Sequence, residues 1–183
     1  MADAADAAAA VVADAAWMRV KAPASRLILQ CAAPARAAAG TAWGVPFSEQ
    51  SCRAQVKGER ATLWLGPDEH LLWQASREAP LPLDALEQAL SGHPHSLVEI
   101  SHRQAALEIS GPHATTILAG ACPLDLDLRE FPVHMCTRTV LAKADIVLWR
   151  TAPAVFHLEV WRSFLPYARA LLSEIGREFS AAR

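Results

Sequence analysis

Two segments of the chain, residues 26–40 and 106–120, repeat one pattern. Each has a short apolar run, then a proline near the start of a helical stretch that contains alanines, then a closing glycine. The apolar run is typical of a buried strand, and proline suits the first turn of a helix because an N–H there would have no helical partner. Both segments are followed by a pair of strand-like runs and a further helical pattern. The repetition therefore predicts a duplicated β-α-β-β-α unit.

The elements within these units can be placed by local signals. Residues 61–74 are the clearest hairpin, since two apolar runs flank a Gly-Pro-Asp turn. The first alanine-rich helix is expected to close at Gly40. Leucines on one face predict a second helix over residues 83–90, with Asp84 and Glu87 in the spacing of a capping box. The pattern as a whole predicts an α+β fold, in which helices pack on one face of a largely antiparallel sheet.

Length and composition favour one folded domain. The chain has 183 residues, of which 52% are hydrophobic and 20% charged. Ten of the first 16 residues are alanine, which provides no large side chain to bury. We therefore expect residues 1–16 to be an alanine-rich flexible tail and residues 17–183 to be a single α+β domain. The 17 basic and 19 acidic residues give no broad basic field, which argues against a nucleic-acid partner.

Signals for export and membrane insertion are weak. The four cysteines match neither a CxxC metal knuckle nor a dense disulfide framework, which favours reduced thiols. Asp3, Asp6 and Asp14 lie where a secretory signal would carry basic residues. No apolar run approaches the roughly 18 to 20 residues that cross a bilayer. The sequence predicts a cytoplasmic protein without a membrane partner.

Two clusters contain side chains that could perform acid-base chemistry or bind a metal. Asp68, Glu69 and His70 stand together in the hairpin turn, but adjacent turn residues point in different directions and do not converge on one atom. His93 and His95 are two residues apart in an expected loop, with no third ligand assigned nearby. Local backbone bonding is the favoured role for the first cluster, and a metal site is disfavoured for the second.

Nucleophile candidates are equally poorly supported. Ser101 and Ser110 lie outside any G-x-S-x-G elbow. Cys136 opens an expected strand beside Arg138, which could lower the pKa of a thiol, and Cys122 ends a helix; buried cysteine is commonly just a small apolar residue. There is no glycine-rich dinucleotide or phosphate loop. The sequence thus predicts no catalytic, cofactor-binding or metal-binding residue, and a small hydrolase using Cys136 or Ser101 remains an alternative.

The tryptophans and arginines point instead to an interface. The expected strands are apolar on both faces, as where Leu63 and Leu65 lie opposite Trp64, so either another layer or another protein covers the second face. We expect core packing to account for two or three of the six tryptophans, and an interface for some of the rest. Polar residues within apolar strand sequence are the candidate subunit-interface residues, with an exposed strand position as the alternative for each: His102, Arg103, Arg138 and Arg162.

Several long blocks of sequence resemble the gamma-subunit family of heterotetrameric sarcosine oxidase. They are ATLWLGPDEHLLW, VEISHRQAALEISGPHATTILAGACPLDL, FPVHMCTRTVLAKADIVLWR and FHLEVWRSF, in a match from about Ala61 to Phe179. More distantly, the ISH...ISGP segment is similar to the folate-binding aminomethyltransferase (glycine-cleavage T-protein) superfamily. That likeness implies a T-protein-like folate-binding-domain fold, in agreement with the duplicated α+β pattern.

The resemblance implies a bacterial cytoplasmic complex of alpha, beta, gamma and delta subunits. Such a complex oxidises sarcosine with oxygen to glycine and hydrogen peroxide, and passes the one-carbon unit to tetrahydrofolate as 5,10-methylenetetrahydrofolate. It implies FAD and substrate on beta, FMN between alpha and beta, NAD and the folate site on alpha, and zinc on delta. For this chain it implies a non-catalytic supporting role without a cofactor of its own. A free-standing folate-binding, aminomethyltransferase-like protein is the alternative, although those enzymes are about twice as long.

Overall fold

A computed structural model describes residues 16–180, so the predicted tail at residues 1–16 lies, except for its last residue, outside the described residues. The described chain contains two five-stranded sheets in which all neighbouring strands are antiparallel. The first sheet has the order β3-β4-β5-β2-β6, formed by Ala54–Lys57, Arg60–Gly66, Glu69–Gln74, Ser25–Cys31 and His95–Glu99. The second sheet has the order β1-β7-β10-β9-β8, formed by Met18–Val20, Gln104–Ser110, Val155–Trp161, Ala144–Ala152 and Cys136–Leu141.

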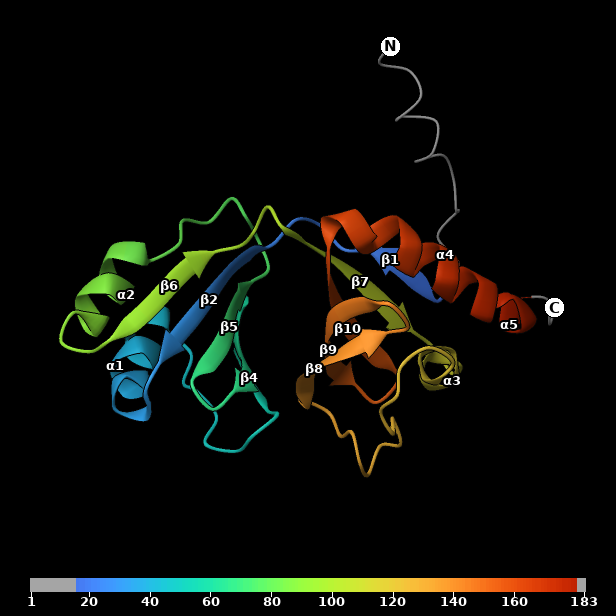
Figure 1. The fold of residues 1–183 in the computed structure, drawn as a ribbon, viewed down its shortest axis with the longest axis horizontal. Helices are drawn as coiled ribbons and strands as arrows, with labels where there is room; N and C mark the ends of the chain where they lie inside the picture. The colour runs from blue at the N-terminus through green and yellow to red at the C-terminus, as the bar shows by residue number, and fades with distance from the viewer. Residues whose placement is uncertain (1–15, 181–183) are drawn as a thin grey trace, which may run out of the picture.

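Helices lie on the outer side of each sheet (Figure 1). On the first sheet they are α1 (Ala33–Trp43) and α2 (Leu83–Leu90). With the second sheet they are α3 (Ala114–Ala119), the 3-10 helix η2 (Arg162–Phe164), α4 (Leu165–Ile175) and α5 (Arg177–Ser180). Each helix layer covers its own apolar core, so the layers run helix, sheet, sheet, helix. No helix among residues 16–180 is both long and apolar enough to span a membrane.

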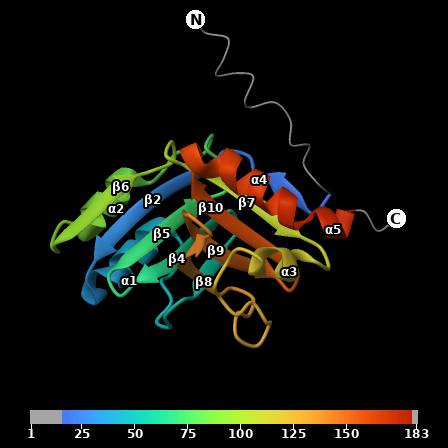
Figure 2. The ribbon, with the colours of Figure 1, turned by 45° about the vertical axis from the view of Figure 1, so that its right-hand side comes forward.

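The two halves of the chain have the same topology. Strands β2, β5, β4 and β3 of the first sheet correspond in order to β7, β10, β9 and β8 of the second. The remaining edge strand is β6 in the first sheet and β1 in the second, so the chain crosses between the sheets in residues 21–24 and again in residues 100–103 (Figure 2). The predicted duplication and α+β class are confirmed, but each unit is β-α-β-β-β-α, with three strands between its helices instead of the expected two. Each unit contributes four neighbouring strands to one sheet, and β1 and β6 complete the two edges.

The inner faces of the two sheets pack against each other. Their apolar contact is a cluster, here called the inter-sheet cluster, of Ala54, Ala61, Leu63, Leu65, Leu71, Ile100, Cys136, Val147 and Trp149, with Ile28, Trp64 and Trp73 beside them. Trp73 of the first sheet meets Trp149 of the second edge to face, with ring centroids 6.0 Å apart. The second apolar face of each sheet was expected to be covered either by another layer or by another protein. Over this part of the sheets it is covered by another layer of the same chain.

Core packing uses more of the tryptophans than the sequence suggested. Trp43, the last residue of α1, is fully buried in the core of the first sheet, Trp149 belongs to the inter-sheet cluster, and Trp64 and Trp73 pack against it. Trp17 packs against the core of the second sheet. The remaining tryptophan, Trp161, is 46% exposed. Five of the six thus contribute to cores, rather than the expected two or three.

The starts of β3 and β8 join the two sheets symmetrically. The N–H of Ala54 donates to the carbonyl of His134 at 2.8 Å, and the N–H of Cys136 donates to the carbonyl of Cys52 at 3.0 Å. Cys52 and His134 both have positive φ, 57° and 68°, a backbone region that is uncommon for residues other than glycine. The matching strain indicates that the same local turn recurs in both halves and fixes one side of the sheet pair.

Two local expectations are wrong. Helix α1 does not close at Gly40 but continues to Trp43, and Gly44 with φ of 86° forms the left-handed cap. Asp84 does not cap α2, because the carbonyl of Pro82 already accepts the N–H of Leu86 and Asp84 lies inside the first turn. The helix positions were predictable in both cases, whereas their ends depended on the neighbouring chain.

Candidate functional site: the cleft between the sheets

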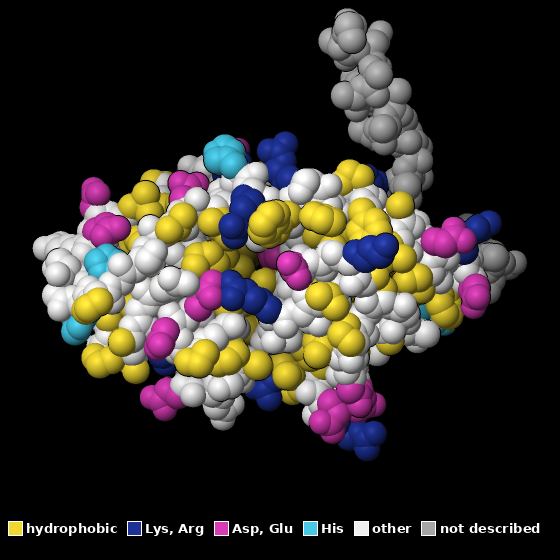
Figure 3. Space-filling view, in the orientation of Figure 1, with side chains coloured by type: hydrophobic (Ala, Val, Ile, Leu, Met, Phe, Trp, Pro, Cys, Tyr) yellow, Lys and Arg dark blue, Asp and Glu magenta, His cyan; other side chains and the backbone are white. Residues whose placement is uncertain are grey.

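A cleft of about 610 Å³ opens between the two sheets. Figure 3 shows the hollow near the centre of this face, with apolar side chains inside and charged side chains at its edge. Strand alternation supplies the apolar lining, because every second residue of a strand faces the inner side. That lining consists of Ile28, Leu65, Leu71, Val98, Ile100, Ile146 and Val147. The volume is in the range of binding sites in proteins, and a few polar groups converge on it.

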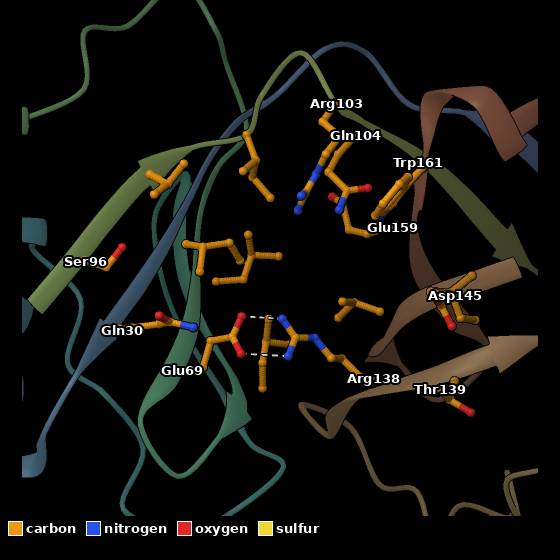
Figure 4. Close-up of a pocket in the computed structure, with 17 residues that line it drawn as sticks. Gln30, Glu69, Ser96, Arg103, Gln104, Arg138, Thr139, Asp145, Glu159 and Trp161 are labelled. Carbon is orange, nitrogen blue, oxygen red and sulfur yellow. Dashed lines mark hydrogen bonds and ion pairs between the residues drawn. The ribbon is translucent and has the colours of Figure 1, made fainter.

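An ion pair crosses the cleft. Arg138 of β8 reaches from the second sheet to Glu69 of β5, as Figure 4 shows. Its Nη1 donates to one carboxylate oxygen at 2.7 Å, and its Nη2 donates to the other. The hydrogen bonds from Arg138 hold the pKa of the Glu69 carboxyl below its usual range, against the opposing effect of partial burial. The pair therefore stays ionised at neutral pH and links the two walls of the cleft.

A second ion pair lies at the inner end of the cleft and is fully buried. The Nε of Arg26 donates to Glu159 at 2.7 Å, and both side chains are 1% exposed. The other carboxylate oxygen of Glu159 lies 2.7 Å from Nε2 of His157. Burial alone would raise the pKa of Glu159, but His157 and Arg26 outweigh it and lower that pKa. Glu159 is thus an ionised group whose two oxygens are both occupied.

Three of the predicted interface residues gather at one rim of the cleft. The guanidinium of Arg103 lies 5.1 Å from the centre of the Trp161 ring, and the carbonyl of Arg103 accepts the N–H of Arg162 at 2.8 Å. His102 precedes them in the same crossing segment, with Nε2 at 2.9 Å from Nη2 of Arg77. His102, Arg103 and Arg162 are exposed, as is Arg138 in the facing wall. Arg103 and Arg138 line the cleft, whereas His102 and Arg162 lie beside Arg103 outside its lining, and the role of all four as interface residues stays a prediction.

The hairpin cluster separates as the sequence indicated. Glu69 points into the cleft toward Arg138, while His70 is buried on the other face of the sheet against Phe47, with ring centroids 4.7 Å apart. Burial is the main cause that lowers the pKa of His70 to about 4. Asp68 stays exposed in the turn. These side chains do not share a site.

The histidine pair near β6 lies in a local hydrogen-bond network. His95 begins β6 rather than lying in a loop, and its Nε2 is 3.0 Å from a carboxylate oxygen of Glu87. Its Nδ1 lies 2.8 Å from the carbonyl of His93, so both ring nitrogens are occupied within the chain. No group of three or more histidine, cysteine, aspartate or glutamate side chains is placed to hold a metal ion in the part of the chain that the structure describes. The described residues therefore do not offer a donor set for zinc.

The nucleophile candidates have structural roles. The hydroxyl of Ser101 accepts the N–H of Arg26 at 2.9 Å and is buried where the chain crosses between the sheets. Cys136 opens β8 as expected, but burial raises the pKa of its thiol to about 12, and Arg138 bonds Glu69 instead of activating it. All four cysteines are unpaired, and Cys122 is buried. A hydrolase built on Cys136 or Ser101 has no support in this geometry.

The buried charged group was missed in the sequence. Arg26 lies at the start of a strand sequence that is mainly apolar, which by itself suggests an exposed strand end and not a buried charge. The signal that could have found the group is the alternation in β10, where His157, Glu159 and Trp161 share one face between buried apolar residues. Charged side chains are almost never fully buried unless they are paired. A Glu159 side chain on this buried face therefore predicts a basic partner.

The fold matches that of one class of enzyme. A solved aminomethyltransferase T of the glycine cleavage system from Bartonella henselae superposes with a TM-score of 0.64, at 13% identity, over 85% of this chain and 45% of that one. At that identity the likeness shows the fold alone. The duplicated antiparallel α+β architecture is therefore that of the T-protein-like proteins, as the sequence predicted.

Closer comparisons show the family. The model of the sarcosine oxidase gamma subunit family matches residues 29–178. The gamma subunit of sarcosine oxidase from Corynebacterium sp. strain U-96 is 38% identical over 145 residues, 79% of this chain and 69% of the relative. The gamma subunit of sarcosine oxidase from an Arthrobacter species is 35% identical over 141 residues, which are 73% of this chain and 68% of the relative. A chain of the solved heterotetrameric sarcosine oxidase from Corynebacterium sp. U-96, in complex with pyrrole 2-carboxylate, superposes with a TM-score of 0.84 at 32% identity, over 91% of this chain and 86% of that one. The chain belongs to the sarcosine oxidase gamma subunit family.

Proposed function

We propose that this chain is the non-catalytic gamma subunit of a heterotetrameric sarcosine oxidase. It supports oxidation of sarcosine to glycine with hydrogen peroxide, and transfer of the one-carbon unit to tetrahydrofolate, by other subunits of a cytoplasmic complex. Alpha, beta and delta chains would hold FAD, FMN, NAD and zinc, and this chain would contribute a folded surface to the assembly. The observation that carries the proposal is the TM-score of 0.84 to a chain of a heterotetrameric sarcosine oxidase, together with the family match.

The chemistry of the cleft supports a role without catalysis by this chain. Glu159 is occupied by Arg26 and His157, and Glu69 by Arg138, so neither carboxylate is poised as an acid or a base. The thiol of Cys136 has its pKa raised to about 12, which removes it as a nucleophile at neutral pH. These groups hold the two sheets together.

Co-purification tests the proposal. Tagged chain is expressed with and without the other subunits encoded in the source cells, and the eluate is examined by gel and by visible absorption. A stoichiometric complex with a flavin spectrum is expected when the partners are present. Repeated elution of the chain without any flavoprotein, from cells that contain active sarcosine oxidase, would refute the assignment.

The alternative function is a free-standing folate-binding protein with the aminomethyltransferase fold. The observation in its favour is the cleft of about 610 Å³ in a fold shared with an aminomethyltransferase. Calorimetric titration of the isolated chain with tetrahydrofolate separates the two functions. The gamma-subunit proposal expects no heat of binding, and saturable binding to the isolated chain would favour the alternative.

A further inference from the structure

The rim of the cleft carries positive charge that the chain itself does not neutralise. Among the described residues, Arg77, Arg103 and Arg162 make no ion pair with a carboxylate, and they come together through His102 and Trp161. By contrast, Arg138 in the facing wall is paired within the chain. The rim is therefore complementary to an acidic group from outside.

Two exposed aromatic side chains accompany these arginines. Trp161 is 46% exposed and Phe164, in the next turn of chain, is 41% exposed. Tryptophan and arginine are among the residue types that most often dominate the binding energy of a protein interface. We call the surface formed by His102, Arg103, Trp161, Arg162 and Phe164 the rim patch.

The cleft below the rim patch has an unmet hydrogen-bonding group. The side-chain carbonyl oxygen of Gln104 is buried, lines the cleft and has no hydrogen-bond partner among residues 16–180. Figure 4 shows Gln104 beside Arg103 and Trp161 at the same wall. An N–H donor entering the cleft at this point would satisfy that oxygen, and apolar groups beside it would contact Ile100 and Val98.

The distribution of these groups indicates the size of the occupant. Arg103, Gln104 and Trp161 line the cleft, but Arg162 and Phe164 are outside its lining, in η2 directly after Trp161. A small molecule held inside the cleft would not reach the outer part of the rim patch. A polypeptide segment can do both, because it offers a backbone N–H, apolar side chains and a carboxylate along one extended stretch.

We propose that the cleft and the rim patch receive an extended segment of a partner subunit that carries an acidic residue next to apolar residues. This inference rests on the proposed function, since it takes the partner from the same complex. The acidic side chain pairs with Arg103, a backbone N–H of the segment meets Gln104, and the apolar side chains occupy the floor of the cleft.

Affinity measurements on the reconstituted complex test the proposal. The other subunits are titrated with wild-type chain, with Arg103→Glu, and with Trp161→Ala. Both variants are expected to weaken binding about tenfold or more, because each removes a central contact. Lys57→Glu and Leu128→Ala are the matched controls, since both residues are exposed and neither lines the cleft; they are expected to stay within about twofold of wild type.

A second measurement does not depend on the folding of a variant. Hydroxyl-radical oxidation of Trp161 is followed by mass spectrometry in the isolated wild-type chain and in the complex. Strong protection of Trp161 from oxidation is expected in the complex. The affinity of the chain for the other subunits is also expected to weaken as the salt concentration is raised.

The outcomes distinguish this inference from the proposed function. Should the wild-type chain assemble while both rim variants bind normally and Trp161 stays reactive, the docking site is wrong and the subunit assignment stands. Absence of any assembly by wild type would defeat the assignment itself. Protection of Trp161 in a dimer of the isolated chain would make a second copy the occupant and would also overturn the inference.

Discussion

Arg26 of β2 and Glu159 of β10 form a 2.7 Å ion pair between the two sheets, far from each other in sequence and almost completely buried. The backbone N–H of Arg26 also donates to the hydroxyl of Ser101, which lies in the crossing segment of residues 100–103. The Nη1 of Arg26 donates to the carbonyl of Ala24 at 2.8 Å, in the crossing segment of residues 21–24. Removing two charges from water costs free energy that only mutual pairing and further hydrogen bonds offset. The pair therefore fixes how the duplicated units sit against each other.

Replacing Glu159 by glutamine should destabilise the protein strongly. The substitution keeps the shape but leaves the charge of Arg26 buried without a counter-ion, which costs about 3–5 kcal/mol of unfolding free energy. Urea unfolding followed by tryptophan fluorescence measures this. The double variant Arg26→Met with Glu159→Leu removes both charges and should recover most of the loss. A loss below about 1 kcal/mol for Glu159→Gln would contradict a tightly coupled buried pair.

Acidification should destabilise the fold through His70. Its pKa is about 4 in the folded state against about 6.5 when unfolded, so between these values the unfolded chain binds more protons. The contribution of neutral His70 to the free energy of unfolding is complete above pH 6.5 and is lost as the pH falls toward 4. The variant His70→Leu should show a shallower decline over that window. Equal slopes for the two proteins, measured by urea unfolding at pH 7, 6, 5 and 4.5, would exclude His70 as the cause.

Thiol reactivity should follow burial. Cys52 is half-buried while Cys31, Cys122 and Cys136 are buried, and burial raises the pKa of Cys136 to about 12. Iodoacetamide at pH 8 is therefore expected to modify Cys52 first and to leave Cys136 unmodified until the chain unfolds. Cys136→Ala should leave the activity of the assembled enzyme unchanged. Rapid modification of native Cys136 would indicate a reactive thiol instead.

The end of α4 should tolerate no side chain at Gly176. A Cβ there would overlap the indole ring of Trp17, which packs against the core of the second sheet. Gly176→Ala should therefore cost about 1–3 kcal/mol, the usual cost of overpacking a core. Gly92→Ala is the control, because a Cβ at Gly92 meets nothing within 4 Å. Thermal unfolding of both variants measures the difference, and equal midpoints would show that Trp17 can move aside.

The local patterns predicted most of the fold. The repeat of residues 26–40 in residues 106–120 was enough to place the duplicated units, because apolar period and proline position are properties of short segments. The pairing of the sheets was not predictable in the same way. It depends on Trp73 meeting Trp149 and Arg26 meeting Glu159 across more than seventy residues of chain, and no local spacing encodes those contacts.

The candidate site was predictable in its residues but not in its shape. His102, Arg103 and Arg162 were chosen as polar residues within apolar strand sequence, and that local expectation is wrong. His102 and Arg103 lie in the turn before β7 and Arg162 begins η2, and the structure places them next to one another at one rim. Arg138 was chosen for the same reason and is held by Glu69 in the facing wall. The cleft forms only when the two sheets pack against each other. The local sequence pattern therefore could not predict that these residues lie close together.

Reconstitution by omission is the most direct test of a supporting subunit. The other subunits are purified and assayed for sarcosine oxidation alone, with this chain, and this chain is assayed by itself after desalting. We predict that the isolated chain carries no flavin and no activity, and that its addition raises the yield and thermal half-life of the active complex. Sarcosine oxidation or retained flavin in the isolated chain, or a complex equally stable without it, would contradict a non-catalytic stabilising role.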